Sequence, residues 1–249
     1  MEVGITGAEG RIGTLLRQGL ADRYSIHAFT LAPQEFPSTE ADISDLTALT
    51  GAFDGLDAVI HLAGDPSPAA RWDSVLKNNI VGTYNVLEEC RRAGVKKVVF
   101  ATTNHTQNGD TMGHSPNTLD LSKHFTIRLN DAPNPTSLYG VSKLTGEQLG
   151  RYFSRQSGIQ FVGLRIGAIG DVDDPRRAVG GPAEDYVRAI FLSRRDCIEV
   201  FTRALEVDRD FVLAYAISNN GRRIFDLRET NENIGFYPQD DAEEYFARG

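Results

Sequence analysis

Apolar and polar positions alternate along this chain with two different periods. Short runs rich in Val, Ile, Ala and Leu, each bounded by turn residues, are typical of strands buried in a parallel sheet. Longer segments between them carry apolar residues at i, i+3, i+4 and i+7, which predicts amphipathic helices. The predicted strands are Met1–Thr6, Ser25–Thr30, Asp57–Ala63, Val95–Ala101, Gln160–Ile166 and Phe211–Ile217, with a further strand ahead of Asp42.

This alternation predicts an α/β protein with a Rossmann fold, in which helices cover a doubly wound parallel sheet. We expect residues 1–170 to form a nucleotide-binding Rossmann domain, and residues 171–249 a small substrate-binding region interleaved with the last Rossmann elements. The long polar connection 106–138 is typical of a functional lid or a partly disordered segment. The predicted helices are Ile12–Leu20, a short helix that ends at Phe53, Trp72–Ala93, Tyr139–Gln156, Ala183–Leu192 and Asp196–Ala204.

Composition narrows the class of protein. The chain has 249 residues, 41% of them hydrophobic and 24% charged, which is ordinary for a soluble protein. The net charge of −8 gives no electrostatic support for binding nucleic acid. The two cysteines, Cys90 and Cys197, lie far apart, which argues against a disulfide framework or a cysteine zinc site. With no signal peptide and no apolar run long enough to span a membrane, we expect a cytoplasmic protein without a membrane partner.

The first strand runs into a glycine-rich turn, Gly7-Ala-Glu-Gly10-Arg-Ile-Gly13, and then into a helix. Gly7 would permit the tight turn, Gly10 would let the backbone approach a pyrophosphate, and Gly13 would let the helix pack closely on the strand. The positive end of the helix dipole favours a phosphate at this place. The alternative is a glycine-rich turn without a ligand. The glycine-rich turn lies in the first βα unit, and this position favours a dinucleotide site over a turn without a ligand.

The coenzyme preference depends on the end of the second strand. Rossmann folds that prefer NAD often place an acidic residue there, to hold the hydroxyls of the adenosine ribose. In this chain the place falls near Thr30 and Leu31, and neither is acidic. A clamp for the 2′-phosphate of NADP is also hard to find, because residues 25–69 contain no Lys or Arg and Arg11 is the only nearby candidate. The missing clamp favours NAD, with NADP as the alternative.

Polar and small residues follow the next strands. Asp42 and Ile43 are candidates to contact adenine, and Asp42 or Ser44 is expected to cap the helix that ends at Phe53. Gly64 follows the fourth strand, where small residues let a cofactor lie against the backbone. Ser67 then lies in a loop at the same edge of the sheet, which makes it a candidate to bind substrate.

Two further clusters combine amides, hydroxyls and an imidazole. Asn78 and Asn79 lie within a predicted helix, and we expect one of them to bond a loop near the cofactor. Thr103, Asn104 and His105 follow the fifth strand, where a substrate would be held. His105 has no carboxylate or second histidine at metal-ligand spacing, so no metal site is predicted. It could hydrogen-bond the substrate or serve as a structural loop residue.

Tyr139 and Lys143 are four positions apart, so they lie on the same side of one helix. A lysine ammonium beside a tyrosine lowers the phenol pKa, and such a phenol can exchange a proton with a substrate hydroxyl. The spacing alone is also common on amphipathic helices with a solvated lysine. It acquires a catalytic interpretation only together with the glycine turn and Thr103.

Taken in order, these motifs resemble the extended short-chain dehydrogenase/reductase family over residues 1 to about 170. The chain is most similar to the branch of uronate dehydrogenases and archaeal NAD-dependent glucose-6-phosphate dehydrogenases. The motifs that carry the resemblance are Thr6-Gly7-x-x-Gly10-x-x-Gly13, Asp42-Ile43, His61-Leu-Ala-Gly64, Asn79-Ile-x-Gly82-Thr83, Thr102-Thr103-Asn-His105, Tyr139-x-x-x-Lys143 and Arg165-Ile-Gly167.

The resemblance implies a dehydrogenase that oxidises the anomeric hydroxyl of an anionic hexose, glucose 6-phosphate or a uronate, to a lactone. Tyr139 would be the base, Lys143 its partner and a ribose ligand, and Thr103 the hydroxyl that positions the substrate. Substrate contacts are implied for Asn104 and His105. The family usually has serine where Thr103 stands, and threonine keeps the hydroxyl. The implied coenzyme contacts are Gly7, Gly10, Arg11, Ile12, Gly13, Asp42, Ile43, Leu62, Ala63, Gly64, Asn79, Lys143 and Ile166.

The anionic end of such a sugar needs a cation, and arginine suits carboxylate and phosphate. The region expected to bind the substrate contains Arg176, Arg177, Arg188, Arg194 and Arg195, most of which would be solvated surface charges. Arg177 and Arg188 are the candidates that we select. The resemblance also implies a homodimer or homo-oligomer. A sugar-nucleotide epimerase or dehydratase is the first alternative, although only a short segment follows Arg165 and no acidic pair follows Thr103. A non-catalytic dinucleotide sensor is the second, although such proteins often lose the Tyr/Lys pair.

Overall fold

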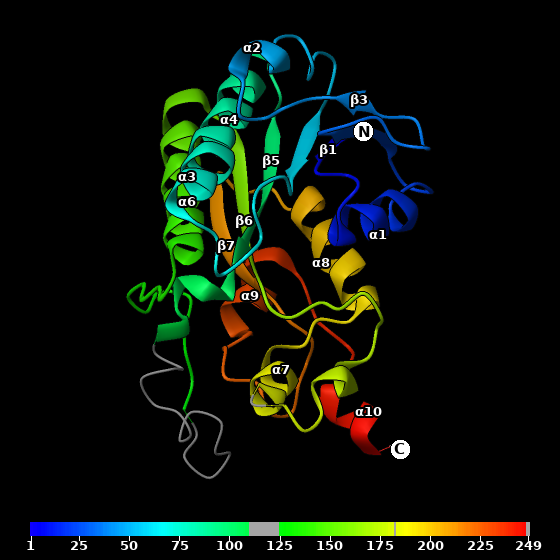
Figure 1. Cartoon of the computed structure of the whole chain (residues 1–249), viewed down its shortest axis with the longest axis vertical. Coiled ribbons are helices and arrows are strands. Elements are labelled where there is room, and N and C mark those ends of the chain that lie inside the picture. Colours follow the sequence, from blue (N-terminus) through cyan, green and yellow to red (C-terminus); the bar gives the residue numbers. More distant parts are fainter. Residues whose placement is uncertain (110–124, 182, 248–249) are drawn as a thin grey trace. The chain divides into compact units, whose positions relative to one another are not determined.

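A computed structural model describes residues 1–109, 125–181 and 183–247 of the chain (Figure 1). The predicted lid 106–138 therefore lies partly outside the described residues. The described strands form a seven-stranded sheet in the order β3-β2-β1-β4-β5-β6-β7, which confirms the Rossmann fold. The strands are β1 (Glu2–Thr6), β2 (Ser25–Thr30), β3 (Thr39–Glu40), β4 (Ala58–His61), β5 (Lys97–Thr103), β6 (Gln160–Ile166) and β7 (Phe211–Ala216).

The strand order reverses beside β1. This strand pairs in parallel with β2 on one side and with β4 on the other, and β2 in turn pairs in parallel with β3. A crevice opens where the order of a parallel sheet reverses, at the carboxyl ends of the strands. The glycine-rich turn follows β1, so it lies at this switch point, where Rossmann folds bind dinucleotides.

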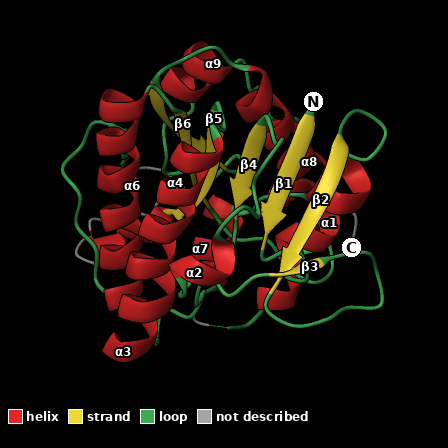
Figure 2. Cartoon of the chain, turned by 90° about the horizontal axis from the view of Figure 1, so that it is seen from above, coloured by secondary structure: helices red, strands yellow, loops and turns green. Residues whose placement is uncertain are grey.

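Most predicted helices begin and end close to the predicted positions, and α4 packs against α6 (Figures 1 and 2). The helix predicted to end at Phe53 ends at Leu49, and the helices Arg228–Ile234 and Ala242–Ala247 were not predicted. The α-helices are α1 (Arg11–Gly19), α2 (Leu46–Leu49), α3 (Trp72–Ser74), α4 (Gly82–Ala93), α6 (Leu138–Ser157), α7 (Glu184–Ile190), α8 (Arg194–Glu206), α9 (Arg228–Ile234) and α10 (Ala242–Ala247). Short 3₁₀ turns span Asn104–Thr106 and Pro175–Ala178.

Two sequence predictions about helices need correction. The predicted helix Trp72–Ala93 is not uniform, because a π-helical segment, Val75–Val81, separates α3 from α4. The short helix α2 is capped by Asp45, whose carboxylate accepts from the Thr47 amide, and not by Asp42 or Ser44. Asp42 instead bonds Ser44 ahead of the helix, so its side chain is already turned away from the capping position.

The chain divides into two compact units that are interleaved along the sequence. The first unit comprises residues 1–102, 137–163 and 208–212, and the second comprises residues 103–136, 164–207 and 213–249. The predicted division at residue 170 separated a nucleotide-binding part of the chain from a substrate-binding part. That functional division stays a prediction.

The first unit has an aromatic and aliphatic core. It is built around Phe29, Phe53, Phe100 and Phe161, all buried. Helix α6 reaches this core because it carries glycine where it crosses the aromatic rings. A Cβ at Gly150 would lie 2.3 Å from the Phe161 ring. A larger residue at Gly150 would therefore require the Phe161 ring or α6 to move.

The second unit has its own core, in which Tyr215 and Phe225 pack with ring centroids 4.7 Å apart. A buried polar network crosses it. The Gln107 side chain accepts from Tyr215 Oη and Arg165 Nη1, and its amide donates to the carbonyls of Arg128 and Asp131. All three side chains are buried.

Candidate active site

The glycine turn is built by steric necessity. Gly7 has φ +68°, and a Cβ there would lie 2.8 Å from the backbone nitrogen of Ala63. A Cβ at Gly13 would lie 2.4 Å from the Gly7 carbonyl oxygen. Helix α1 begins after Gly10 with no side-chain cap and no acid in its first turn. The N-terminal end of a helix favours an anion, so these residues fit the pyrophosphate of a dinucleotide.

Asn79 joins the loop after β4 to helix α6. Its Oδ1 accepts from the Asp65 amide at 2.7 Å, and its Nδ2 donates to the Asp65 carbonyl and to Ser142 Oγ, both at 3.0 Å. Gly64, with φ +145°, lies against the side-chain amide of Asn79, because a Cβ at Gly64 would be 3.0 Å from Asn79 Oδ1. The expectation that one asparagine bonds a neighbouring loop is confirmed for Asn79. The contact to Ser142 fixes α6 one residue before Lys143.

Tyr139 and Lys143 lie in the first two turns of α6, which begins after Ser137. The Ser137 hydroxyl accepts from the Gly140 amide at 3.1 Å, so the start of the helix is capped. Lys143 is only 5% exposed, and burial lowers its pKa to about 8. Its Nζ lies 4.8 Å from the Phe100 ring centroid and 6.0 Å from that of Tyr139. A buried cation thus stands beside the candidate base.

His61 had no predicted role, and it proves to be fully buried in the same unit. Its Nδ1 lies 2.8 Å from Thr6 Oγ1 and its Nε2 lies 3.1 Å from Thr83 Oγ1. Burial, and secondarily the charge of Lys143, lower the His61 pKa to about 3. The neutral ring therefore ties the ends of β1 and β4 to α4 across the physiological pH range. Nothing in its local sequence distinguishes this role from a solvated histidine.

Asp42 and Ile43 follow β3 in the first unit. Asp42 Oδ1 accepts from the amide and hydroxyl of Ser44, and these hydrogen bonds lower its pKa, so the carboxylate is ionised at neutral pH. The Ile43 carbonyl accepts from Asn85 Nδ2 at 2.8 Å. A Cβ at Gly82 would lie 2.6 Å from the Ile43 side chain, so glycine allows α4 to approach this segment.

Thr103, Asn104 and His105 belong to the second unit, where they form one hydrogen-bonded group. Thr103 Oγ1 accepts from the His105 amide at 3.2 Å and donates to Asn104 Oδ1 at 3.4 Å. The Asn104 amide donates to the hydroxyl of Tyr186, a residue of α7 that has no sequence motif. His105 Nδ1 lies 3.2 Å from Asn108 Nδ2, and burial lowers the His105 pKa.

Four further predicted site residues differ in exposure and in the contacts of their side chains. Ser67 and Arg177 are exposed, and Ile166 is buried in β6. Arg188 is paired with Glu184 at 3.0 Å and Glu243 at 3.5 Å, and its guanidinium lies 3.5 Å from the Phe246 ring centroid. Of the two arginines, Arg177 is the more available to an incoming anion.

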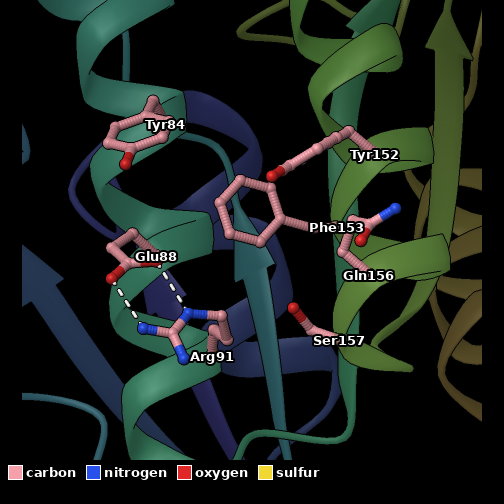
Figure 3. A pocket seen from close by; sticks show the side chains of 7 residues that line it. All are labelled: Tyr84, Glu88, Arg91, Tyr152, Phe153, Gln156 and Ser157. Carbon is pink, nitrogen blue, oxygen red and sulfur yellow. Dashed lines mark hydrogen bonds and ion pairs between the residues drawn. The ribbon is translucent and has the colours of Figure 1, made fainter.

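A groove of about 500 Å³ lies on α4 and α6 (Figure 3). Tyr152 lines it, and this residue is 13 positions beyond Tyr139, which is roughly 20 Å along a helix. The groove is therefore distinct from the start of α6, where Tyr139 and Lys143 lie. Its lining residues are Tyr84, Glu88, Arg91, Tyr152, Phe153, Gln156 and Ser157.

The described residues contain neither a metal-binding cluster nor a membrane-spanning helix. Within ranges 1–109, 125–181 and 183–247, no group of three or more His, Cys, Asp or Glu side chains is placed to hold a metal ion. Over those same residues, no helix combines the length and apolar character that crossing a membrane requires.

The model of the NAD dependent epimerase/dehydratase family matches residues 3–214. The chain belongs to this family. It is 37% identical over 256 residues to the NAD-dependent glucose-6-phosphate dehydrogenase of Haloferax volcanii, covering 98% of this chain and 95% of that protein. It is also 38% identical over 247 residues to the L-arabinose 1-dehydrogenase (NAD(P)(+)) of the same organism, covering 96% and 97%.

A solved glucuronic acid dehydrogenase from Chromohalobacter salexigens superimposes with a TM-score of 0.82 at 26% identity, covering 99% of this chain and 87% of that one. The predicted resemblance to extended short-chain dehydrogenases of the uronate and glucose-6-phosphate branch is thus confirmed. The roles of individual site residues stay predictions.

Proposed function

We propose that this family member is an NAD-dependent sugar dehydrogenase that oxidises the anomeric hydroxyl of an anionic hexose to the lactone. The single observation that carries the proposal is the buried Lys143 beside Tyr139 on α6, in the same compact unit as the glycine turn. The two relatives named as sugar dehydrogenases, aligned over nearly the whole chain, support a sugar as the substrate.

In this proposal Tyr139 takes the proton from the sugar hydroxyl. Lys143 favours the tyrosinate because a buried cation stabilises a neighbouring negative charge more strongly than a solvated one does. At neutral pH its ammonium form predominates even with the lowered pKa of about 8. Thr103, Asn104 and His105 would bind sugar oxygens. The nicotinamide, when bound, supplies the hydride acceptor.

The two relatives are named for different sugars. One is named for a sugar phosphate and the other for L-arabinose, a neutral pentose. We propose an anionic hexose, held by Arg177, because this exposed guanidinium is more available than that of Arg188. Glucose 6-phosphate and the uronates are the substrates to test first, with neutral aldoses as the competing class.

The test is a panel of hexose phosphates, uronates and neutral aldoses, each with NAD⁺ and NADP⁺, followed by absorbance of the reduced nicotinamide. We expect turnover with an anionic hexose and NAD⁺. An Arg177→Ala variant should raise KM for that sugar and spare a neutral one. If none of the sugars in the panel supported reduction of the coenzyme, the proposal would be overturned. Conversion of a sugar nucleotide without net coenzyme change would favour an epimerase instead.

We further propose a cytoplasmic homodimer or homo-oligomer. Cys90 and Cys197 are buried free thiols, as a reducing compartment permits. Tyr84 and Tyr152 are 44% and 58% exposed beside the groove of α4 and α6, and such apolar faces mark contact surfaces. Light scattering on the eluting protein should give a multiple of 27.4 kDa, and Tyr152→Glu should shift it towards the monomer. A wild-type monomer would overturn this assignment.

A further inference from the structure

The end of β2 lacks the residue that usually reads the adenosine ribose. Strand β2 ends at Thr30, and the residues that follow, Leu31-Ala-Pro33, carry no charge. Thr30 Oγ1 donates to the Ala32 carbonyl at 2.9 Å, so this hydroxyl is committed to the turn. No side chain of the strand end therefore offers the anionic acceptor that Rossmann folds with NAD commonly place there.

Glu9 brings a carboxylate to that place from another segment. It lies within the glycine turn, and its Oε1 is 3.3 Å from the backbone nitrogen of Leu31. The turn and the strand are also joined by the Ala8 amide, which donates to the Phe29 carbonyl at 3.2 Å. Glu9 itself is exposed, so its second oxygen can meet a ligand at this edge.

Arg17 is the cation that α1 brings to the same edge, and its position is set by two contacts. Its guanidinium carbon lies 3.4 Å from the Phe36 ring centroid, and its Nε donates to the Ala8 carbonyl at 3.0 Å. A bidentate phosphate clamp requires a guanidinium whose fork faces the ligand. Arg17 is stacked on the Phe36 ring and bonded to Ala8, whereas the Glu9 carboxylate is bonded to the strand end itself.

We propose that Glu9 determines the coenzyme preference of this protein, an inference that rests on the proposed function. Its carboxylate accepts a hydrogen bond from an adenosine ribose hydroxyl of NAD. The same carboxylate repels the 2′-phosphate of NADP, which carries about −1.5 to −2 charges at neutral pH, as phosphate monoesters do. The acid that the second strand lacks is thus supplied by the glycine turn.

The experiment is equilibrium binding of NAD⁺ and NADP⁺ to the full chain by titration calorimetry, without a sugar. The wild type should bind NAD⁺ more tightly. Glu9→Gln keeps the size and an acceptor oxygen but removes the charge, so NADP⁺ should bind about tenfold more tightly while NAD⁺ changes less than about threefold. Added salt should shrink the discrimination of the wild type more than that of the variant.

The matched control is Glu35→Gln, which removes an exposed carboxylate from the segment that follows β2. It should leave both dissociation constants unchanged. Glu9→Ala, which also removes the acceptor, should weaken NAD⁺. An unchanged ratio of the two constants in both Glu9 variants would overturn the assignment of Glu9 alone. Binding of neither dinucleotide to the wild type would overturn the proposed function with it.

Discussion

The two compact units hold their functional side chains in place by different means. In the first, close backbone packing at glycines and a core of aromatic and aliphatic residues position the turn and α6. In the second, a buried polar network of Gln107, Arg165 and Tyr215 crosses the core. Close packing at glycines leaves no room for a larger side chain, whereas a buried polar network is stabilising only when every member is satisfied.

The two units also differ in how far apart in the sequence their key residues lie. The glycine turn of the first unit is contained in seven consecutive residues. The Gln107 contacts to Arg165 and Tyr215 join residues 58 and 108 positions apart. Four experiments test this contrast, from the largest expected effect to the smallest.

Tyr139→Phe should abolish the chemistry that we assign to the first unit without disturbing its fold. Removal of a general base costs about 10²–10⁴-fold in turnover, so kcat should fall by at least about a hundredfold. The ring that packs on α6 remains, so the dissociation constant of NAD⁺ should change less than about twofold. Steady-state kinetics and calorimetry measure the two quantities, and full activity would refute the assignment of Tyr139.

Gln107→Ala should be more disruptive than its size suggests. It leaves the Tyr215 hydroxyl, the Arg165 guanidinium and two backbone carbonyls with a lost partner inside the second core. Such losses cost about 2–4 kcal/mol of unfolding free energy. Urea unfolding measures the loss, with Gln18→Ala at an exposed position of α1 as the neutral control. Equal stability of the two variants would remove the contrast between the units.

Lys143→Met should stabilise the first unit at neutral pH while it removes activity. Burial lowers the Lys143 pKa from 10.5 to about 8, so between these values the unfolded state binds more protons than the folded state. Wild-type stability should therefore rise from about pH 8 to pH 10.5. The variant should lack this rise and be more stable at pH 7 by an amount on the order of 2 kcal/mol. Parallel stability curves against pH would contradict the cost of burying this lysine.

Tyr186→Phe should change sugar binding by a small amount. It keeps the ring of α7 but removes the hydroxyl that accepts from the Asn104 amide. One hydrogen bond is worth about 1 kcal/mol, which predicts a rise of about fivefold in KM for the sugar with the affinity for NAD⁺ unchanged. Tyr237→Phe, at a 65% exposed position, is the control. The control should have the KM of the wild type, and identical KM values in the two variants would count against a role for Tyr186.

The sequence predicted most of the first unit because its signals are local. Strand and helix periods and the glycine turn depend on residues within a few positions of one another. The contact from Asn79 to the loop after β4 was also expected, because an asparagine within a helix needs a partner.

Other features depend on tertiary contacts, and sequence reasoning could not assign them. Tyr186 lies in an ordinary amphipathic helix, and only the fold brings it to Asn104, 82 positions away. His61 resembles any strand-end histidine until Thr6 and Thr83 enclose it. Asp45 was passed over as the cap of α2 because three polar residues precede that helix, and local hydrogen bonds choose among them.

The π-helical segment Val75–Val81 has a consequence for how this chain and its relatives can vary. A π turn accommodates an extra residue within an otherwise regular helix. One residue can therefore be lost ahead of Asn79 by reversion to α-helical spacing, with α4 and its contacts to Ile43 and His61 undisturbed. We expect single-residue insertions and deletions among family members to gather in this segment, where the helix can absorb them.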